Sequence, residues 1–374
     1  MFADSKPHYV LLDALRGVCA LCVVYYHIFE GFATSPQEEQ FNHGYLAVDF
    51  FFILSGFVIG YAYDDRWPQM GLRAFFRRRL IRLHPMVVMG TLIGLATYLI
   101  QGAETWDGAH PNPLQIVLAA VMGMLMLPCW PGCRADVRGN GEMFPLDGPQ
   151  WSLFFEYIGN ILYALIIHRL PTRVLRIWTL LLGIGLIAMA LSDVSGSYSI
   201  GVGWTMAESG LPGGLLRMLF SYSLGMLLAR SQRLHHLTLP LPAIIAAAFV
   251  LIGCFSVPYI GGQSHPECNA IYDCLCLMVV FPIVLLTGAN IKSIGDRMTR
   301  VSLILGHLSY PLYMVHYPLM YLFFSYIWEH QLSFSQAWPI ALLTYLGSLL
   351  LGWLVYRLYD APVRKWLTNR LVRR

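Results

Sequence analysis

Runs of apolar residues long enough to cross a membrane recur along almost the whole chain. Each run holds roughly 17 to 25 residues, and a helix of about 20 residues spans a hydrocarbon core of about 30 Å. Polar segments rich in arginine, glycine and proline separate the runs. We expect ten spanning helices, over residues 9–29, 44–63, 85–101, 151–168, 174–192, 213–230, 239–258, 270–289, 303–328 and 337–359.

The charges of the connecting segments alternate along the chain. Segments with surplus lysine or arginine are 66–82, 169–176, 230–233, 292–300 and 364–374. The segments between them hold acidic residues but no lysine or arginine: 30–42, 102–112, 193–212, 259–269 and 329–336. Because cytoplasmic loops carry the excess of positive charge, the basic segments and both termini are expected in the cytoplasm.

One further apolar stretch, residues 113–128, would invert every later loop if it crossed the bilayer. It is the shortest of the three stretches between Arg82 and Arg169, and a polar segment rich in proline and glycine follows it. We expect this stretch to be re-entrant or to lie on the outer surface. The prediction is an all-α integral membrane protein of about ten transmembrane helices, with residues 1–374 forming a single polytopic domain and no soluble extra-membrane domain.

The composition is typical of a membrane protein and argues against nucleic-acid binding and a metal site. Apolar residues make up 57% of the chain and charged residues only 12%, whereas soluble proteins carry about 25% charged residues. The net charge of +4 is spread over short loops, which indicates orientation in the bilayer and not nucleic-acid binding. The eight cysteines show no paired CxxC pattern, so no metal site is expected, while a disulfide among Cys129, Cys133 and Cys268 stays open.

Motifs of other enzyme classes are absent from the sequence. It contains no P-loop, no GxGxxG after a strand and no HExxH, so ATP hydrolysis, hydride transfer and zinc proteolysis lack support. It also lacks GxSxG, and we assign Ser55 and Gly56 to helix packing.

Ionisable residues inside spanning helices are costly and usually functional. Arg16 and His27 are eleven residues apart, so they share a helix face at a separation of roughly 16 Å, with His27 nearer the outer side. Asp49 and Glu156 lie at a similar depth on helices that run inward from the outer surface. We therefore expect His27, Asp49 and Glu156 to converge, so that a carboxylate orients the histidine as a general base. The alternative is a structural hydrogen-bond network between helices.

Four arginines, including Arg78, Arg79 and Arg82, directly precede the predicted helix 85–101. Arg79 and Arg82 would share a face if this stretch is helical. Their guanidinium groups suit the phosphates of a nucleotide, because the planar fork matches phosphate geometry. The alternative is a topology anchor that binds anionic lipid.

Aromatic residues accompany the remaining candidates. Trp130, Trp151 and Trp204 lie in outer segments and suit stacking on a sugar ring, although interfacial anchoring also explains tryptophan there. Tyr310, Tyr313 and Tyr317 flank His316, which could line a channel or satisfy a neighbouring helix. We assign His307 to structure.

Five blocks resemble the bacterial membrane acyltransferase 3 family, which acylates cell-surface and secreted glycans. They are LDALRG (12–17) followed by His27, GYLAVDFFFILSGF (44–57), RRLIRLHP (78–85), GPQWSLFFE (148–156) and LSYPLYMVHYPL (308–319). The blocks occur in the family's order and span nearly the whole chain.

The resemblance implies roles for individual residues. Arg16 and His27 match the family's arginine and essential histidine, and Glu156 matches its Trp-Ser-Leu-x-x-Glu glutamate. Arg79 and Arg82 match the cytoplasmic arginine pair that contacts acyl-CoA. It further implies acetyl-CoA as donor, a carbohydrate or glycoconjugate acceptor, and a multi-pass protein of the bacterial inner membrane. The sequence leaves open whether the protein is a monomer or a homodimer.

These observations give one mechanism and one rival. In the mechanism, the arginines hold the nucleotide while the pantetheine arm passes Arg16 and presents its thioester to His27. Asp49 or Glu156 would orient the imidazole, and Arg16 or nearby polar side chains could stabilise the thioester or the tetrahedral oxyanion. We assign Arg78 and His316 to donor binding as well. An acyl-histidine intermediate is a variant of this scheme. The rival is a proton-coupled transporter in which His27, Asp49 and Glu156 form a relay.

Overall fold

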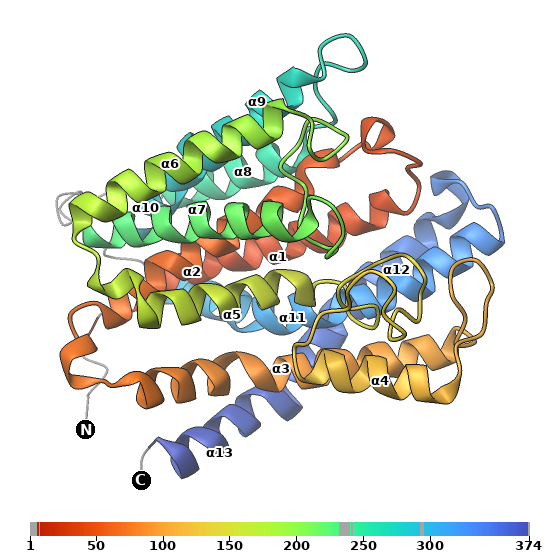
Figure 1. Ribbon diagram of the computed structural model, residues 1–374, viewed down its shortest axis with the longest axis horizontal. Coiled ribbons are helices and arrows are strands. Elements are labelled where there is room, and N and C mark those ends of the chain that lie inside the picture. Colours follow the sequence, from red (N-terminus) through yellow and green to blue (C-terminus); the bar gives the residue numbers. More distant parts are fainter. Residues whose placement is uncertain (1–5, 7, 232–239, 241, 292–294, 373–374) are drawn as a thin grey trace.

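The computed structural model describes residues 6, 8–231, 240, 242–291 and 295–372, which form a bundle of helices (Figure 1). The elements are α1 (Val10–Glu30), η1 (Pro36–Glu38), η2 (Asn42–Leu46), α2 (Ala47–Tyr63), η3 (Trp67–Gln69), α3 (Leu72–Ile100), α4 (Pro113–Met124), α5 (Gln150–Leu165), η4 (Ile167–Arg169), α6 (Thr172–Leu191), α7 (Gly210–Arg230), α8 (Pro242–Ser256), α9 (Glu267–Leu275), η6 (Cys276–Val280), α10 (Phe281–Ala289), α11 (Asp296–Glu329), α12 (Phe334–Val355), η7 (Tyr356–Asp360) and α13 (Ala361–Leu371). Among the described residues, β pairing is limited to an isolated bridge between Glu142 and Thr205. The all-α prediction is confirmed.

Seven helical stretches in the described part of the chain are long and apolar enough to cross a membrane. They are Val10–Glu30, Asn42–Tyr63, Leu72–Ile100, Thr172–Leu191, Gly210–Arg230, Glu267–Ala289 and Phe334–Leu371. The other three predicted spans correspond to α5 and α8, which have 16 and 15 residues, and to the more polar α11. The chain is a multi-pass membrane protein, while the count of ten and the sidedness stay predictions.

Helix α4 is the stretch that we expected not to cross. Its 12 residues extend roughly 18 Å, well short of the roughly 30 Å hydrocarbon core. Asn112 caps its start, because the Asn112 side chain accepts from the backbone N–H of Gln115 and the Gln115 side chain accepts from that of Asn112. The helix packs along the far end of α3 (Figure 1). Its length agrees with the expectation.

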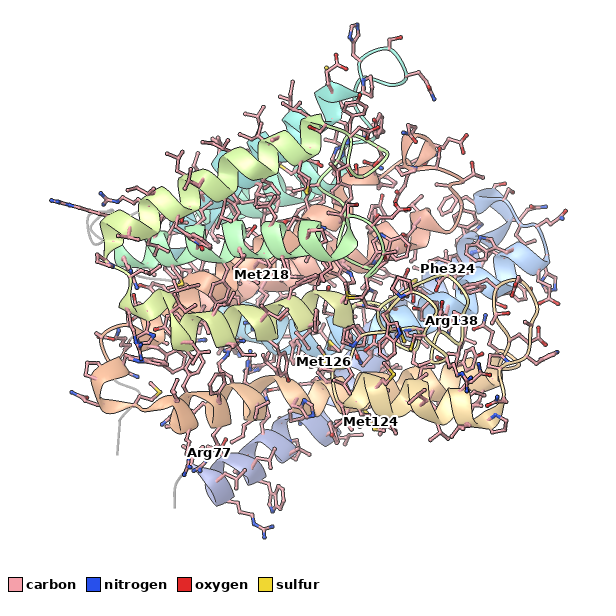
Figure 2. The ribbon with its side chains drawn as sticks, viewed as in Figure 1. Arg77, Met124, Met126, Arg138, Met218 and Phe324 are labelled. Carbon is pink, nitrogen blue, oxygen red and sulfur yellow. The ribbon has the colours of Figure 1, made fainter. Side chains whose placement is uncertain are left out.

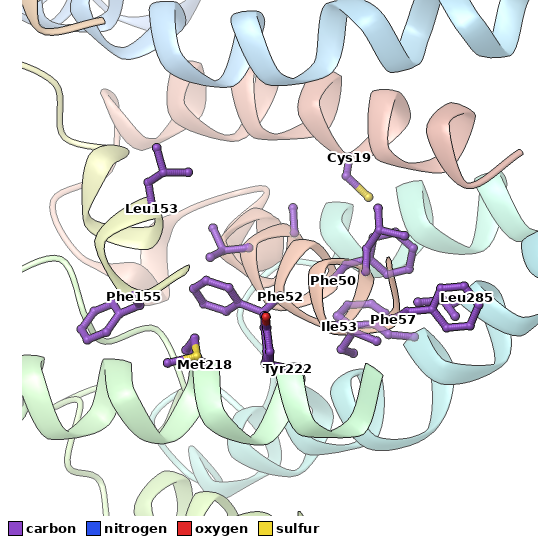
Figure 3. Packing of buried hydrophobic residues seen from close by; sticks show 14 of the residues in the cluster. Cys19, Phe50, Phe52, Ile53, Phe57, Leu153, Phe155, Met218, Tyr222 and Leu285 are labelled. Atoms are coloured by element: carbon purple, nitrogen blue, oxygen red, sulfur yellow. The ribbon is translucent and has the colours of Figure 1, made fainter. Parts of the chain in front are cut away.

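Helix α2 lies at the centre of one half of the bundle. Figure 3 shows its residues Phe50, Ile53 and Phe57 packed between α1 and α7. At Gly56 the two backbones come so close that an added Cβ would lie 2.0 Å from the carbonyl oxygen of Tyr222. Only glycine permits this approach, so the predicted packing role of Gly56 is confirmed.

Helix α11 organises the other half, where it packs against α1, α3 and α12. A Cβ at Gly17 of α1 would lie 2.5 Å from the Cβ of Leu305, so these two helices also approach closely. This contact brings the His27 face of α1 against the middle of α11, where His316 lies fully buried.

The segment between α4 and α5 folds back onto the bundle around the fully buried Arg138 (Figure 2). Its Nε donates to the carbonyl oxygen of Pro145 at 2.6 Å, and its guanidinium group lies 3.5 Å from the ring centroid of Tyr321. The segment is therefore a packed part of the fold, and it determines where α5 begins.

The two ends of the described chain lie at the same end of the bundle. Lys6 forms an ion pair with Asp65 at 2.7 Å, and Arg77 donates to the carbonyl oxygen of Leu371. Asp65 lies in the connection between α2 and α3 and Arg77 near the start of α3, which agrees with termini on one side of the membrane. Residues 232–233, 292–294 and 373–374 of the predicted basic segments lie outside the described residues.

Candidate active site

A cavity of about 440 Å³ opens beside His27, and we call it the His27 chamber. Its wall comes from α1, α2, α5, α7, α11, the 31–46 connection and the two long segments that precede α5 and α7. Its polar and aromatic lining includes His27, Glu30, Glu39, Glu142, Trp151, Trp204, Arg217 and Tyr317. A cavity of this size accommodates a small ligand.

His27 is held by a carboxylate one turn further along its own helix. Its Nδ1 lies 2.6 Å from Oε2 of Glu30, and the Tyr317 ring packs against the imidazole with its centroid 4.7 Å away. Because a carboxylate only accepts hydrogen bonds, Nδ1 carries the proton and Nε2 keeps its lone pair. This is the tautomer that a general base requires.

His316 packs beside His27, with ring centroids 5.4 Å apart. Its side chain is 0% exposed, and its Nδ1 lies 2.8 Å from the carbonyl oxygen of Tyr313. Nδ1 is therefore the donor, and Nε2 has no hydrogen-bond partner among the described residues. The structure therefore packs His316 beside His27, and His316 is not among the residues that line the His27 chamber.

A second cavity of about 140 Å³, the arginine chamber, lies next along the bundle. Its polar lining includes Arg16, Ser55, Arg79, Arg82, Glu156 and Ser309. α3 begins at Leu72 and carries the arginines as one continuous helix, so the prediction that Arg79 and Arg82 share a face is confirmed.

Arg16 and Arg79 are fixed by polar partners within this chamber. The Arg16 guanidinium group donates to Oγ of Ser309 and to the carbonyl oxygen of Gly306, each at 2.8 Å. Arg79 donates to Oε1 of Glu156 at 2.7 Å. Both guanidinium groups are thus held in place where they line the cavity.

A third cavity, the α13 groove, lies between α3 and α13 and holds about 440 Å³. Its polar lining consists of Arg78, Arg82, Arg364, Lys365, Thr368 and Asn369. Arg82 lines both this groove and the arginine chamber, whereas Val48 and Tyr313 line both the arginine chamber and the His27 chamber. The three cavities therefore follow one another along the bundle through shared walls.

Comparison with known proteins identifies the family of this chain. A family model described as an acyltransferase domain matches residues 9–357. The chain belongs to the membrane acyltransferase 3 family.

Relatives of this acyltransferase differ in how far the similarity extends. Protein 2 in the picA locus of Rhizobium radiobacter is 35% identical over 171 residues, which are 43% of this chain and 84% of that protein. Acyltransferase MdmB of Streptomyces mycarofaciens is 23% identical over 96% of this chain and 92% of its own length. A Staphylococcus aureus protein, SACOL0978, whose name gives O-acetyltransferase as a provisional activity, is 24% identical over 95% of this chain but only 57% of its own length. No solved structure matches this chain.

The predicted convergence of His27, Asp49 and Glu156 is wrong for this acyltransferase. Asp49 instead forms a fully buried ion pair with Arg217, at 2.6 Å between Oδ2 and the guanidinium group. Glu156 lines the arginine chamber and accepts from Arg79. The depth of Glu156 was misjudged because α5 begins only after the folded 125–149 segment, and not at a membrane surface.

Other assignments are corrected by particular contacts. Ser55 is not only a packing residue, since its hydroxyl donates to Oε1 of Glu156 at 2.6 Å. Trp151 and Trp204 line the His27 chamber, whereas Trp130 is 59% exposed and lies outside its lining. His307 stacks on Tyr356, with ring centroids 5.0 Å apart, as its structural assignment predicts. All eight cysteines are free thiols.

The sequence reasoning missed Glu30, Glu39 and Arg217. Glu30 was placed in a loop, although its i, i+3 spacing from His27 is a signal for contact once the helix extends that far. Arg217 lies inside a predicted span, where a charged residue indicates a buried partner. Nothing in the local sequence marks Glu39, because the connection around it is not periodic.

Proposed function

We propose that this protein transfers an acyl group, acetyl above all, from cytoplasmic acyl-CoA to a hydroxyl group of a carbohydrate or glycoconjugate on the opposite side of the bacterial inner membrane. The observation that carries the proposal is the order of the three cavities. A cationic groove, a chamber lined by arginines and a chamber with a carboxylate-oriented histidine share walls in sequence. The names of the full-length relatives support acyl transfer.

The phosphates of CoA suit the α13 groove. Arg82 has no hydrogen-bond partner and no ion pair among the described residues, although it is largely enclosed between two cavities. Arg364 is paired with Asp360 at 2.8 Å, which leaves Arg78, Arg82 and Lys365 in excess over the acidic groups of the lining. Charge-assisted hydrogen bonds from guanidinium groups to phosphate would satisfy this excess.

The pantetheine arm would then extend through the arginine chamber toward Tyr313. Arg16 and His27 are separated by eleven residues of one helix, or roughly 16 Å. A thioester that reaches His27 is therefore out of reach of Arg16, so Arg16 would contact the arm of the donor. This assigns Arg16 to donor positioning and leaves the reacting carbonyl carbon to the His27 chamber.

The reaction then follows from the free Nε2 of His27. This nitrogen takes the proton of the acceptor hydroxyl while the oxygen attacks the thioester carbonyl carbon. The C–O bond forms, the C–S bond breaks, and the imidazolium returns the proton to the CoA thiolate. Glu30 holds the ring and stabilises the imidazolium that forms during the transfer.

The contacts of Asp49 and Glu156 do not support the alternative hypothesis of a proton-coupled transporter. A proton relay needs neighbouring groups, yet Asp49 is paired with Arg217 and Glu156 lines a different cavity from His27. No contact among the described residues joins the three side chains to one another.

Calorimetric binding of acetyl-CoA to the purified protein tests the donor site without knowledge of the acceptor. Wild type is expected to bind, and Arg82→Gln to bind at least about tenfold more weakly, because a phosphate contact is lost. His27→Asn should bind like wild type, as should the control Arg173→Gln on α6. Absence of binding to wild type, or equal binding by the Arg82 variant, would contradict the proposal.

A further inference from the structure

The His27 chamber contains buried acceptor atoms that the protein leaves without partners. Glu39 is only 6% exposed and Asn42 only 2%, and both line the chamber. Oε1 of Glu39 and Oδ1 of Asn42 have no hydrogen-bond partner among the described residues. The Asn42 amide nitrogen is used, because it donates to the carbonyl oxygen of Pro36 at 2.8 Å. Buried polar atoms of this kind normally have a partner, so these two point to a ligand that donates.

The charge of the chamber wall narrows the class of that ligand. Its carboxyl groups are Glu30, Glu39 and Glu142, and its basic side chains are His27 and Arg217. Arg217 is neutralised by its two hydrogen bonds to Asp49, and His27 is bonded to Glu30. No basic side chain of the lining is therefore left for Glu39. A cationic group of a ligand is therefore the partner that the ionised form of Glu39 would take.

We infer that the acceptor carries a protonated amino group, as in an amino sugar, which binds Oε1 of Glu39 and Oδ1 of Asn42 while a hydroxyl group of the same molecule lies at His27. An ammonium group has three donors and a positive charge, so it satisfies both atoms. Trp151 and Trp204 line the same chamber and suit the faces of a sugar ring. The inference rests on the proposed function, because it names the acceptor of that reaction.

The protonation of Glu39 supplies an independent readout. Burial and the nearby charge of Glu30 raise the pKa of Glu39 to about 10, so this carboxyl group carries a proton at neutral pH. Glu142 lines the same chamber. The basic side chains of the lining are already bonded, His27 to Glu30 and Arg217 to Asp49. Binding of an ammonium group favours the ionised carboxylate, so a proton should be released to the buffer.

Three p-nitrophenyl β-glycosides test the inference on the full-length protein: the glucosaminide, the glucoside and the glucuronide. Binding is measured by calorimetry in two buffers of different ionisation enthalpy, at a pH that keeps the amine protonated, and turnover by CoA thiol release from acetyl-CoA. Wild type should bind the glucosaminide about tenfold more tightly than the glucoside, with proton release, and the glucuronide most weakly.

The matched variants are Glu39→Gln, which keeps the shape of the side chain, and Glu38→Gln on the exposed neighbour. Glu39→Gln should lose both the preference and the proton release, and Glu38→Gln should keep both. Equal binding of the three glycosides, binding of none, or a preference that survives in Glu39→Gln would overturn the inference. If the same preparation fails to bind acetyl-CoA, the proposed function itself fails; if it binds acetyl-CoA without preferring the amine, only the acceptor inference fails.

Discussion

Val48 of α2 and Tyr313 of α11 both line the His27 chamber and the arginine chamber, so these two side chains stand at the boundary between them. Tyr313 is fixed there, because its hydroxyl group lies 2.7 Å from Oγ of Ser152. A donor that extends from the arginine chamber into the His27 chamber would therefore pass this pair. The boundary is therefore where the donor site and the site of chemistry can be separated experimentally.

Enlarging Val48 should block that passage. Val48→Trp is expected to lower acyl transfer about a hundredfold, because the thioester no longer reaches His27 in the right position. Acetyl-CoA binding should stay within about twofold of wild type, because the nucleotide contacts are unchanged. Turnover and calorimetric binding on the same preparation measure the split. Leu92→Trp, at an exposed position of α3, is the control for the added bulk. Equal loss of acyl transfer and of acetyl-CoA binding in Val48→Trp would argue against the shared boundary.

The contact between Glu30 and His27 should matter for rate and not for donor affinity. Glu30→Gln keeps the size of the side chain but removes the charge that holds the Nδ1–H tautomer and stabilises the imidazolium. We expect turnover to fall about a hundredfold, within the range typical of general acid–base catalysis. CoA release measures it, with Glu38→Gln as control. An unchanged rate would mean that Glu30 has no part in the chemistry.

The Asp49–Arg217 pair should act on stability. Asp49→Asn leaves the buried Arg217 charge uncompensated, which typically costs about 3 kcal/mol or more. Thermal unfolding in detergent should show a lower midpoint for this variant. The double variant Asp49→Asn, Arg217→Gln should recover part of the loss, because no unpaired charge remains. If the double variant loses as much stability as the two single variants lose in sum, the two side chains are not coupled.

Glu142 should make stability depend on pH close to neutrality. Burial, reinforced by the charge of Glu30, raises its pKa from the ordinary 4.5 to about 7, although Tyr321 and Arg138 oppose the shift. Between these two pH values the folded protein keeps a proton that the unfolded chain has released. This contribution to stability is complete below about pH 4.5 and is lost as the pH rises to about 7, a change of about 3 kcal/mol.

Glu142→Gln should remove this component, so its unfolding midpoint should fall less between pH 4.5 and 7 than that of wild type. Unfolding of both proteins across this range is the measurement, and Glu104→Gln on an exposed loop is the control. Parallel curves for wild type and Glu142→Gln would show that Glu142 does not titrate in this window.

The apolar runs predicted most of the helices because a membrane helix is encoded by local composition. The arginine pair was also predictable, since an i, i+3 spacing fixes a shared face once the helix is known. The depth of a side chain in the membrane was harder to predict from the sequence. Counting residues from an assumed membrane surface placed Glu156 beside His27, but α5 starts part-way along the bundle, after the packed segment around Arg138 (Figure 1). That packing depends on contacts with Gln101 and Tyr321 far away in the sequence.

The residues of the His27 chamber likewise divide into those that the sequence identifies and those that it does not. His27 and Arg16 stand out because charged groups are rare in spanning helices. Glu39 and Asn42 lie in a connection whose path is set by tertiary contacts, such as that of His43 Nδ1 with the carbonyl oxygen of Val257 at 2.8 Å. Their burial beside His27 could not be read from the sequence, which gave no reason to distinguish them from solvent-exposed loop residues.

The central claim is that His27 acts on an acyl group delivered from the other side of the membrane, and sealed proteoliposomes test it most directly. Acetyl-CoA with a labelled acetyl group is supplied on the side of the α13 groove, and p-nitrophenyl β-D-glucosaminide on the side of the His27 chamber. For wild type we expect free CoA thiol to accumulate on the donor side and labelled ester on the acceptor side, with neither formed by His27→Asn. Labelled ester formed by His27→Asn at the wild-type rate, or no loss of thioester with wild type, would contradict the account.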